Sequence, residues 1–368
     1  MKNVGASSQS EIAGRVFIIG FDGTEMTARL RALLARIQPS GVILFRRNID
    51  TPRQTWELLR ECRRAVAHPI FTCVDMEGGT VDRFRDALGA TPAAAEVFAS
   101  GSDHLFQKHG RVIGDSCRAL GFNVDFAPAL DLALPEAKPV MTSRVVSDDP
   151  EQVVKYGRAF LRGLAAAKVL GCGKHFPGLG GAHLDTHQEL PSVTRSSKQM
   201  FAEDLIPYRL LRGVLPFVMV CHAAYPLVTG NRGPASLSHK WMTEILRKKI
   251  GYRGLVVTDD MEMGALQEAS PMAEAAVAAL EAGADQLLVC HQEEMIVTAY
   301  ESVVRGSEHS RRFAARVAES ARRADGVRKR LGRIATAPSA SSVERLSRAV
   351  WEFSEEVRMA VLAREDAA

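Results

Sequence analysis

The sequence predicts a single-domain (β/α)8 barrel of the TIM type, followed by a helical C-terminal extension. Two observations favour this fold. Eight short apolar runs recur along the chain without polar–apolar alternation, which is typical of parallel strands buried on both faces. Segments with helical periodicity separate these runs, as an α/β barrel requires. A doubly wound open sheet is the alternative, but the chain lacks a phosphate-binding glycine loop and a dinucleotide fingerprint.

The expected strands and helices follow one another in regular order. Strands are expected at residues 16–20, 41–45, 70–75, 123–127, 169–175, 217–222, 255–259 and 286–290. Helices are expected at residues 26–37, 53–67, 103–120, 150–167, 240–250 and 273–282. Asp149 supplies an N-cap, and Pro150 after it suits the first helical position. Gly251 follows another helix where a left-handed residue is favoured.

The chain becomes rich in arginine after the last expected strand. Eight arginines lie between residues 311 and 333, with acidic residues and a partial apolar stripe among them. We interpret this segment as a helix packed outside the barrel, with a nucleic-acid-binding arm as the less favoured alternative. We therefore divide the chain into a flexible N-terminus (1–13), a barrel (14–335), and a linker with a closing helix (336–368).

Composition excludes several classes of protein. Of the 368 residues, 46% are hydrophobic and 24% are charged, as in ordinary globular proteins. The net charge of +4 gives no broad basic field for nucleic acid, and no apolar run is long enough to span a membrane. The N-terminal residues lack the apolar region of a signal peptide. The six cysteines have no close pairs and favour buried free thiols, so we expect a cytoplasmic protein.

Polar side chains gather where the expected strands end. In this type of barrel, function lies at the C-terminal ends of the strands and in the loops that follow them. Six of the eight strands end in such groups: Arg47 and Asn48, Asp75 and Glu77, Lys174 and His175, His222, Asp259 and Asp260, and His291. A single member could be a structural ion pair. Six such groups at one rim of the barrel predict a binding site for a polar ligand.

The most specific segment is the glycine-rich loop that starts at Lys174 and His175. Asp185 and His187 lie near its end, two positions apart, so a turn would let the carboxylate bind the imidazole. That contact would orient the ring and raise its pKa, as a general acid/base needs. A metal site formed by His183, Asp185 and His187 is the alternative, which we favour less because a flexible loop pre-organises ligands poorly.

These motifs resemble glycoside hydrolase family 3. They are Lys-His-Phe-Pro-Gly at 174–178, Asp-x-His at 185–187 and Asp-Asp-Met at 259–261. More narrowly, the chain resembles the bacterial β-N-acetylglucosaminidases of peptidoglycan recycling. Asp75-x-Glu77-Gly78-Gly79 with Arg83, and then Arg144, occur in the order that the family has them. The resemblance covers about residues 14–335.

The resemblance implies a role for each matching residue. Asp259 corresponds to the catalytic nucleophile, His187 to the acid/base, and Asp185 to the partner of that histidine. The residues that correspond to sugar-binding positions are Asp75, Arg83, Arg144, Lys174 and His175. From the residues alone, Asp260 is an alternative nucleophile, and Arg83 and Arg144 could form barrel ion pairs instead. His222 and His291 either line the pocket or support it.

The resemblance implies a retaining exo-β-N-acetylglucosaminidase, or β-N-acetylhexosaminidase. Such an enzyme releases terminal β-linked N-acetylglucosamine through a covalent glycosyl-aspartate intermediate. We expect small carbohydrate substrates, such as peptidoglycan- or chitin-derived and muropeptide-like fragments, and no metal, cofactor, nucleic acid or membrane. The alternatives are a family 3 β-glucosidase or β-xylosidase, a glycosyl phosphorylase, and a catalytically silent sugar-binding protein. The intact Asp259, Asp185 and His187 disfavour the last.

Overall fold

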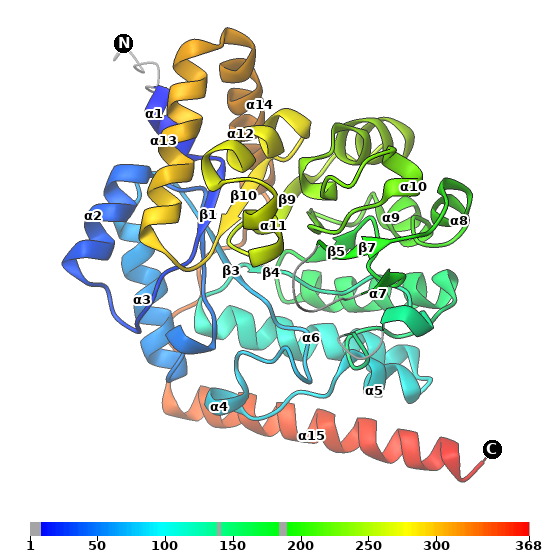
Figure 1. Cartoon of the computed structure of the whole chain (residues 1–368). Coiled ribbons are helices and arrows are strands. Elements are labelled where there is room, and N and C mark those ends of the chain that lie inside the picture. Colours follow the sequence, from blue (N-terminus) through cyan, green and yellow to red (C-terminus); the bar gives the residue numbers. More distant parts are fainter. Residues whose placement is uncertain (1–8, 138–140, 184–189, 368) are drawn as a thin grey trace.

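Eight parallel strands form the barrel that the sequence predicts (Figure 1). The computed structural model describes residues 9–137, 141–183 and 190–367. The strands of the barrel are β1 (Phe17–Ile19), β2 (Gly41–Ile43), β3 (Phe71–Val74), β4 (Val124–Asp125), β5 (Cys172–Phe176), β8 (Phe217–Val220), β9 (Leu255–Asp260) and β10 (Gln286–Val289). Their order in the sheet is β4-β3-β2-β1-β10-β9-β8-β5. Each lies within or next to one of the eight expected runs.

Bridges between β4 and the chain around β5 join the two ends of this sheet. Val124 pairs with Leu170, and Ala129 pairs with Lys174, both in parallel orientation. The Asp125 N–H donates to the Leu170 carbonyl at 2.9 Å, and the Cys172 N–H donates to the Ala127 carbonyl at 2.8 Å. The polar ends of the strands consequently meet at one rim, because all eight strands run in the same direction.

Helices surround the barrel. The expected ones are α2 (Ala28–Ile37), α3 (Pro52–Ala65), α6 (Asp103–Leu120), α7 (Pro150–Ala166), a π-type helix (Lys240–Lys249) and α12 (Met272–Ala282). Thr27, Thr51, Ser102 and Asp149 accept hydrogen bonds from the first turns of α2, α3, α6 and α7. Helix α13 (Glu293–His309) is not among the predicted elements, and neither are α8 (Ser197–Ala202), α9 (Ile206–Leu211), α10 (Pro226–Thr229) and α11 (Gly264–Ala269).

The core has two layers. Alternate strand residues, such as Ile18, Ile43 and Phe71, fill the barrel interior, whereas Phe17 and Ile19 pack outward against the helices. This division follows from the two-residue period of a strand. The six cysteines are all buried and free, so the predicted thiols are confirmed. Among the described residues, no helix is both long and apolar enough to cross a membrane.

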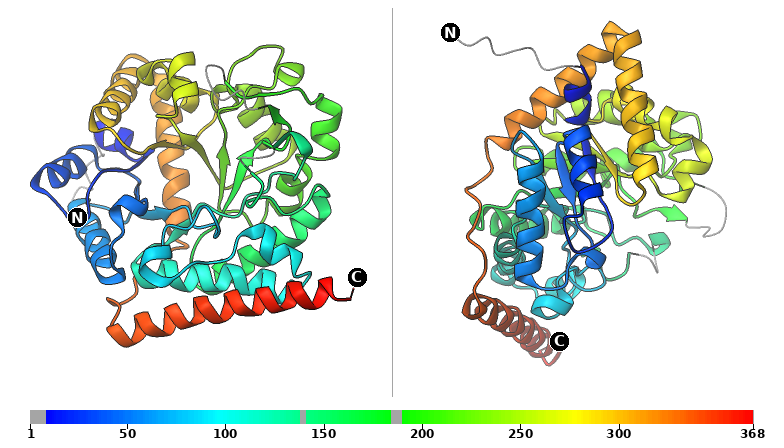
Figure 2. Two further views of the ribbon diagram at one scale, coloured as in Figure 1. Left: turned by 60° about the horizontal axis from the view of Figure 1, so that its bottom comes forward. Right: turned by 90° about the vertical axis from the view of Figure 1, so that its left-hand side faces the viewer.

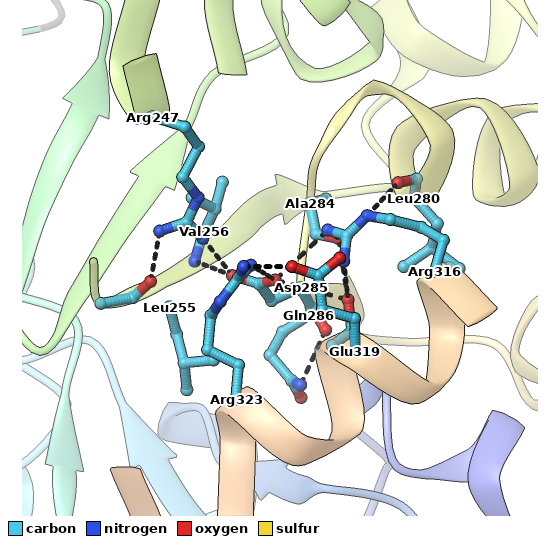
Figure 3. Close-up of polar contacts among 12 residues, drawn as sticks. Arg247, Leu255, Val256, Leu280, Ala284, Asp285, Gln286, Arg316, Glu319 and Arg323 are labelled. Carbon is cyan, nitrogen blue, oxygen red and sulfur yellow. Dashed lines mark hydrogen bonds and ion pairs between the residues drawn. The ribbon is translucent and has the colours of Figure 1, made fainter. Parts of the chain in front are cut away.

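The arginine-rich segment forms α14 (Arg311–Arg328), which packs against the N-terminal end of the barrel and closes it. Ala324 and Val327 belong to the same apolar cluster as the barrel interior. Asp285, fully buried at the start of β10, pairs with Arg316 at 3.2 Å and with Arg323 at 2.5 Å, and also with Arg247. Figure 3 shows Arg316 and Arg323 reaching Asp285 from α14. The prediction of a helix packed outside the barrel is therefore confirmed.

Helix α15 (Ala340–Glu365) lies along the outside of the barrel beside α6, as Figures 1 and 2 show. Its buried face, with Val350, Phe353 and Val357, packs on α4 (Arg85–Leu88), α5 (Ala94–Ala99) and α6. The helix begins at Ala340, within the segment 336–368 that we expected to hold a linker and a closing helix. At the other end of the chain, α1 (Gln9–Gly14) contains residues 9–13 of the segment that we expected to be flexible.

Candidate active site

A dense group of charged side chains lies at the C-terminal rim of the barrel. Lys174, on β5, places its Nζ 2.7 Å from Asp75 Oδ1 and 2.7 Å from Glu77 Oε1, both of which follow β3. Its side chain is only 2% exposed. Burial lowers the pKa of the ammonium, but the two carboxylates raise it above its ordinary value, so Lys174 stays charged. Two of the predicted sugar-binding residues, Asp75 and Lys174, are thus brought into contact.

Glu77 connects this pair to Arg144. The guanidinium donates from Nε to Glu77 Oε2 and from Nη2 to Oε1, both at 2.8 Å. Burial would raise the pKa of the Glu77 carboxyl, but Lys174 and Arg144 hold it well below its usual value. Glu77 is therefore an ionised carboxylate shared by two cations. Arg144, for which a barrel ion pair was the alternative, forms such a pair within the rim cluster itself.

His175 is held by an aspartate that the sequence reasoning missed. Asp131 lies 2.7 Å from His175 Nδ1, and it accepts the backbone N–H of Leu179 at 2.8 Å. Arg144 Nη2 lies 3.2 Å from His175 Nε2 and can only donate, so the ring proton is on Nδ1. Asp131 follows β4 within an otherwise apolar run. That isolated acidic residue is the signal that could have found it.

Asp259 lies near the end of β9. The N–H of Asp260 donates to its Oδ1 at 2.9 Å. Burial would raise the pKa of Asp259, but the imidazoles of His175 and His222, the Asp260 N–H and the Lys174 ammonium lower it below its ordinary value. Asp259 is therefore an ionised, half-buried carboxylate, next to the cluster of Asp75, Lys174 and His175.

The neighbouring carboxyl of Asp260 has different surroundings. It faces His291, with 3.1 Å between Oδ2 and Nε2. Burial raises its pKa to about 6. The pKa values of the two adjacent acids are therefore shifted in opposite directions, and the lower pKa of Asp259 makes it the better candidate for an anionic nucleophile.

The Arg83 side chain lies near the ring of Phe45, which follows β2. Its guanidinium carbon lies 5.8 Å from the centre of the Phe45 ring. Its Nε is buried and has no hydrogen-bond partner among the residues that the structure describes. The alternative interpretation was that Arg83 forms an ion pair within the barrel. Arg83 has no acidic partner of this kind among the described residues.

Asp185 and His187 lie outside the described residues. The segments on either side of them form two short antiparallel strands, β6 (Ala182–His183) and β7 (Ser192–Val193), in which Ala182 pairs with Val193. β7 is followed by Arg195, which binds the buried Asp204 at 2.8 Å. Strands of two residues have too little pattern for a sequence-based prediction.

No three His, Cys, Asp or Glu residues of the described part of the chain are grouped as metal ligands would be. The alternative metal site includes Asp185 and His187, which lie outside that part. The described rim offers a different chemistry. Its charged donors and acceptors can hydrogen-bond to sugar hydroxyls, and Asp259 can attack an electrophilic carbon.

Comparison with known proteins identifies the family. Residues 10–325 match the model of the glycosyl hydrolase family 3 N-terminal domain. A beta-hexosaminidase of Idiomarina loihiensis is 36% identical over 278 residues, which are 74% of this chain and 83% of that protein. A family 3 beta-N-acetylglucosaminidase from Paenibacillus aligns with a TM-score of 0.87 and 31% identity, over 95% of this chain and 69% of that one.

A third relative is a solved structure of NagZ from Neisseria gonorrhoeae in complex with a zinc ion. It aligns with a TM-score of 0.72 and 27% identity, over 92% of this chain and 98% of that one. The match to the family model spans most of the chain, and the identity to a curated relative exceeds 30% over most of both sequences. The protein therefore belongs to glycosyl hydrolase family 3 and is a glycoside hydrolase.

Proposed function

We propose that the protein is a retaining exo-β-N-acetylglucosaminidase with Asp259 as its nucleophile. The observation that carries this proposal is the ionised, half-buried Asp259 at the strand-end rim, next to the cluster of Lys174, His175 and Asp75. The names of the relatives, beta-hexosaminidase and beta-N-acetylglucosaminidase, support the choice of sugar.

The reaction takes place in two displacements. An oxygen of Asp259 bonds to the anomeric carbon while the glycosidic C–O bond breaks, and the leaving oxygen takes a proton from His187. In the second step, His187 removes a proton from water, the water oxygen bonds to the anomeric carbon, and Asp259 leaves as a carboxylate. Two inversions give retention. The resemblance assigns His187 its role and makes Asp185 its orienting partner.

The rim cluster suits the recognition of the terminal sugar. Lys174 and Arg144 are fixed by Glu77 and Asp75, so their remaining N–H donors are pre-oriented toward a ligand. Charge-assisted hydrogen bonds to hydroxyls are strong in a buried site and fix the orientation of the substrate. We assign Asp75, Arg144, Lys174 and His175 to this task. Arg83, whose Nε has no hydrogen-bond partner within the described part of the chain, is a further candidate.

We also propose that the natural substrates are peptidoglycan- or chitin-derived fragments and that the protein acts in the cytoplasm. The buried free cysteines support a reducing compartment. The resemblance to enzymes of peptidoglycan recycling supports the substrate class.

Hydrolysis of three aryl glycosides tests the proposed specificity. The N-acetylglucosaminide should be cleaved far faster than the glucoside or the xyloside, and NMR should show the β-anomer as the first product. Faster cleavage of the glucoside or xyloside would favour the other family 3 activities. A sugar phosphate formed in phosphate buffer would indicate a phosphorylase. Binding without turnover of any of the three would indicate a silent sugar-binding protein.

The assigned acid/base can be tested through the leaving group. His187→Ala should slow the hydrolysis of a natural disaccharide strongly, but that of an aryl glycoside with an acidic leaving group much less, because the latter needs little protonation. Rates of both substrates are compared in the same preparation. An equal loss on both would contradict the acid role of His187.

A further inference from the structure

Asp260, the residue after the proposed nucleophile, makes contacts that the two displacements do not use. Its Oδ2 lies 3.1 Å from His291 Nε2, and its Oδ1 accepts the N–H of Glu262 at 3.1 Å. Asp260 follows Asp259 at the end of β9, and His291 follows β10, the neighbouring strand. The pair therefore links two adjacent strands at the rim of the active site.

Both polar backbone groups of Asp260, the N–H and the carbonyl, form hydrogen bonds. Its N–H donates to Asp259 Oδ1 at 2.9 Å. Its carbonyl accepts from His222 Nε2 at 3.0 Å, and the other ring nitrogen of His222 lies 2.6 Å from the Ser236 hydroxyl. A carbonyl only accepts, so His222 Nε2 carries a proton. The backbone of Asp260, which these hydrogen bonds fix, thus holds the nucleophilic carboxylate in place.

His291 is itself held in place. Its N–H, like those of Cys290 and Gln292, donates to the carboxylate of Glu262. Its ring stacks on Phe45, with 5.6 Å between the ring centres and 23° between the planes. The side chain is nevertheless 46% exposed, so the imidazole can exchange its proton with solvent.

The stacked side chains of His291 and Phe45 connect the ends of the two strands that flank β1. Phe45 follows β2, and in the sheet β1 lies between β2 and β10. Gly20 follows β1 at this point, and a Cβ there would lie only 2.2 Å from the Cys290 carbonyl. Arg47 connects the same two strand ends, because its Nη2 donates to the Cys290 carbonyl at 2.7 Å. The absence of a side chain at Gly20 allows this close approach of β1 to β10.

We propose that His291 is a positioning residue for the nucleophile, which acts by pairing with the Asp260 carboxylate and thereby fixing the peptide N–H that supports Asp259. This inference rests on the proposed function, since it takes Asp259 as the nucleophile. The pair holds the side chain of Asp260, while His222 holds its carbonyl. Together the two histidines set the direction in which the Asp260 N–H points.

The pair predicts a specific pH dependence. The groups that face Asp260 are Glu262, which raises the pKa of its carboxyl, His291, which lowers it, and the Cys290 thiol, which donates to it. Burial dominates and raises that pKa to about 6. Protonation below this pH removes the charge that attracts His291, so activity should fall on the acid side. The pKa of Asp259 is too low to account for a loss in this range.

Three variants and a double mutant test the proposal. His291→Phe keeps a ring that can stack on Phe45 but removes the partner of Asp260, and Asp260→Asn removes the titrating group. His309→Phe is the matched control, because His309 is an exposed residue at the C-terminal end of α13, the opposite end of the helix from His291. For each variant, kcat and KM for the aryl N-acetylglucosaminide are measured from pH 4.5 to 8.5.

We expect His291→Phe to lower kcat about tenfold at pH 6 with little change in KM, and about twofold at pH 8, since Asp260 ionises again at higher pH. The acid limb of its profile should move up by about one pH unit. In Asp260→Asn, adding His291→Phe should no longer shift the acid limb and should change kcat by less than about twofold further, because the two residues act as a unit. His309→Phe should match the wild type.

An unshifted acid limb in His291→Phe, or full additivity in the double mutant, would overturn the proposal. Thermal unfolding of each variant identifies loss of activity caused by misfolding. In that case His291→Asn, which keeps an N–H donor without a charge, should still show the shifted limb. The proposed function fails in a different way: the wild type would then not cleave the N-acetylglucosaminide, or Asp260→Asn would abolish turnover while Asp259→Asn retained it.

Discussion

Two adjacent carboxylates at the end of one strand have opposite electrostatic environments. Asp259 faces the cationic side of the rim, and its pKa is lowered, whereas the half-buried Asp260 faces His291, and its pKa is raised to about 6. Successive residues of a strand point to opposite sides, which is why neighbours in sequence have different partners. At the scale of the residue, this alternation lets Asp259 serve as the nucleophile while Asp260 helps to hold it in place.

Replacing the nucleophile gives the most direct prediction. Asp259→Ala should lower kcat by several orders of magnitude, because no carboxylate remains to form the glycosyl-enzyme. Steady-state hydrolysis of the aryl N-acetylglucosaminide measures the loss, and circular dichroism checks that the fold is retained. A folded variant with substantial activity would contradict the assignment.

Glu77 gives a prediction about stability. Glu77→Gln should lower the free energy of unfolding by about 3–5 kcal/mol, because it leaves the buried Lys174 and Arg144 without their shared charge. Denaturant unfolding measures this loss. Glu57→Gln, in an exposed pair with Arg53, is the control and should change little.

The same carboxylate makes stability depend on pH. The pKa of Glu77 is lower in the folded protein than its ordinary value of 4.5. Its contribution is therefore fully present above that value and is lost as the pH falls below it. The difference in stability between the wild type and Glu77→Gln should shrink as the pH is lowered from 6 toward 3. A constant difference would show that Glu77 is not ionised in the fold.

At the scale of the element, α15 supports the rim from outside. Phe353 stacks on His109 of α6, with 5.5 Å between ring centres and 23° between planes. His109 in turn lies against Gly78, where a Cβ would be 3.2 Å from its Nε2. Gly78 follows Glu77 directly and has a φ of +85°, a conformation that favours glycine. The closing helix thus packs behind the turn that carries Glu77.

Removal of the Phe353 ring from this contact should destabilise the protein. Phe353→Ala should cost about 3–5 kcal/mol, because it removes a fully buried ring and leaves a cavity against His109. Trp351→Ala on the same helix should have a small effect, since Trp351 is 64% exposed. Thermal unfolding of both variants makes the comparison. Similar losses for the two would show that α15 does not pack as described.

At the scale of the whole molecule, the two ends of the barrel have separate tasks. The C-terminal rim carries the proposed site, and the N-terminal end is closed by α14 through Asp285 and its three arginines (Figure 3). This separation is the usual one in such barrels, where one face serves function and the other stability.

A variant at the closed end should therefore affect stability alone. Asp285→Asn should lower the free energy of unfolding by about 3–5 kcal/mol, because it leaves partly buried arginines without their common carboxylate. The values of kcat and KM, measured well below the unfolding transition, should stay those of the wild type. A changed KM in the folded variant would contradict the separation.

Much of the fold and part of the site were predictable from the sequence. Apolar runs and helical periodicity determine burial over a few residues, so all eight barrel strands and six of the helices around them could be placed. The motifs at strand ends predicted that Asp75 and Lys174 lie at the same rim, because parallel strands end there; their contact is a finding of the structure. Helix α13 was predictable in principle, since its buried Ile296, Ala299, Tyr300 and Val303 recur at helical spacing.

The sequence by itself determined the barrel, the order of its elements and the residues at its rim. The tertiary structure alone decided which of these residues face one another. Asp131 holds His175 from 44 residues away, and Asp285 receives Arg323 from 38 residues away. His291 meets Asp260 across two strands. Periodicity reports which side of an element is buried, but a pairing between distant side chains depends on the register and closure of the sheet, which no local pattern encodes.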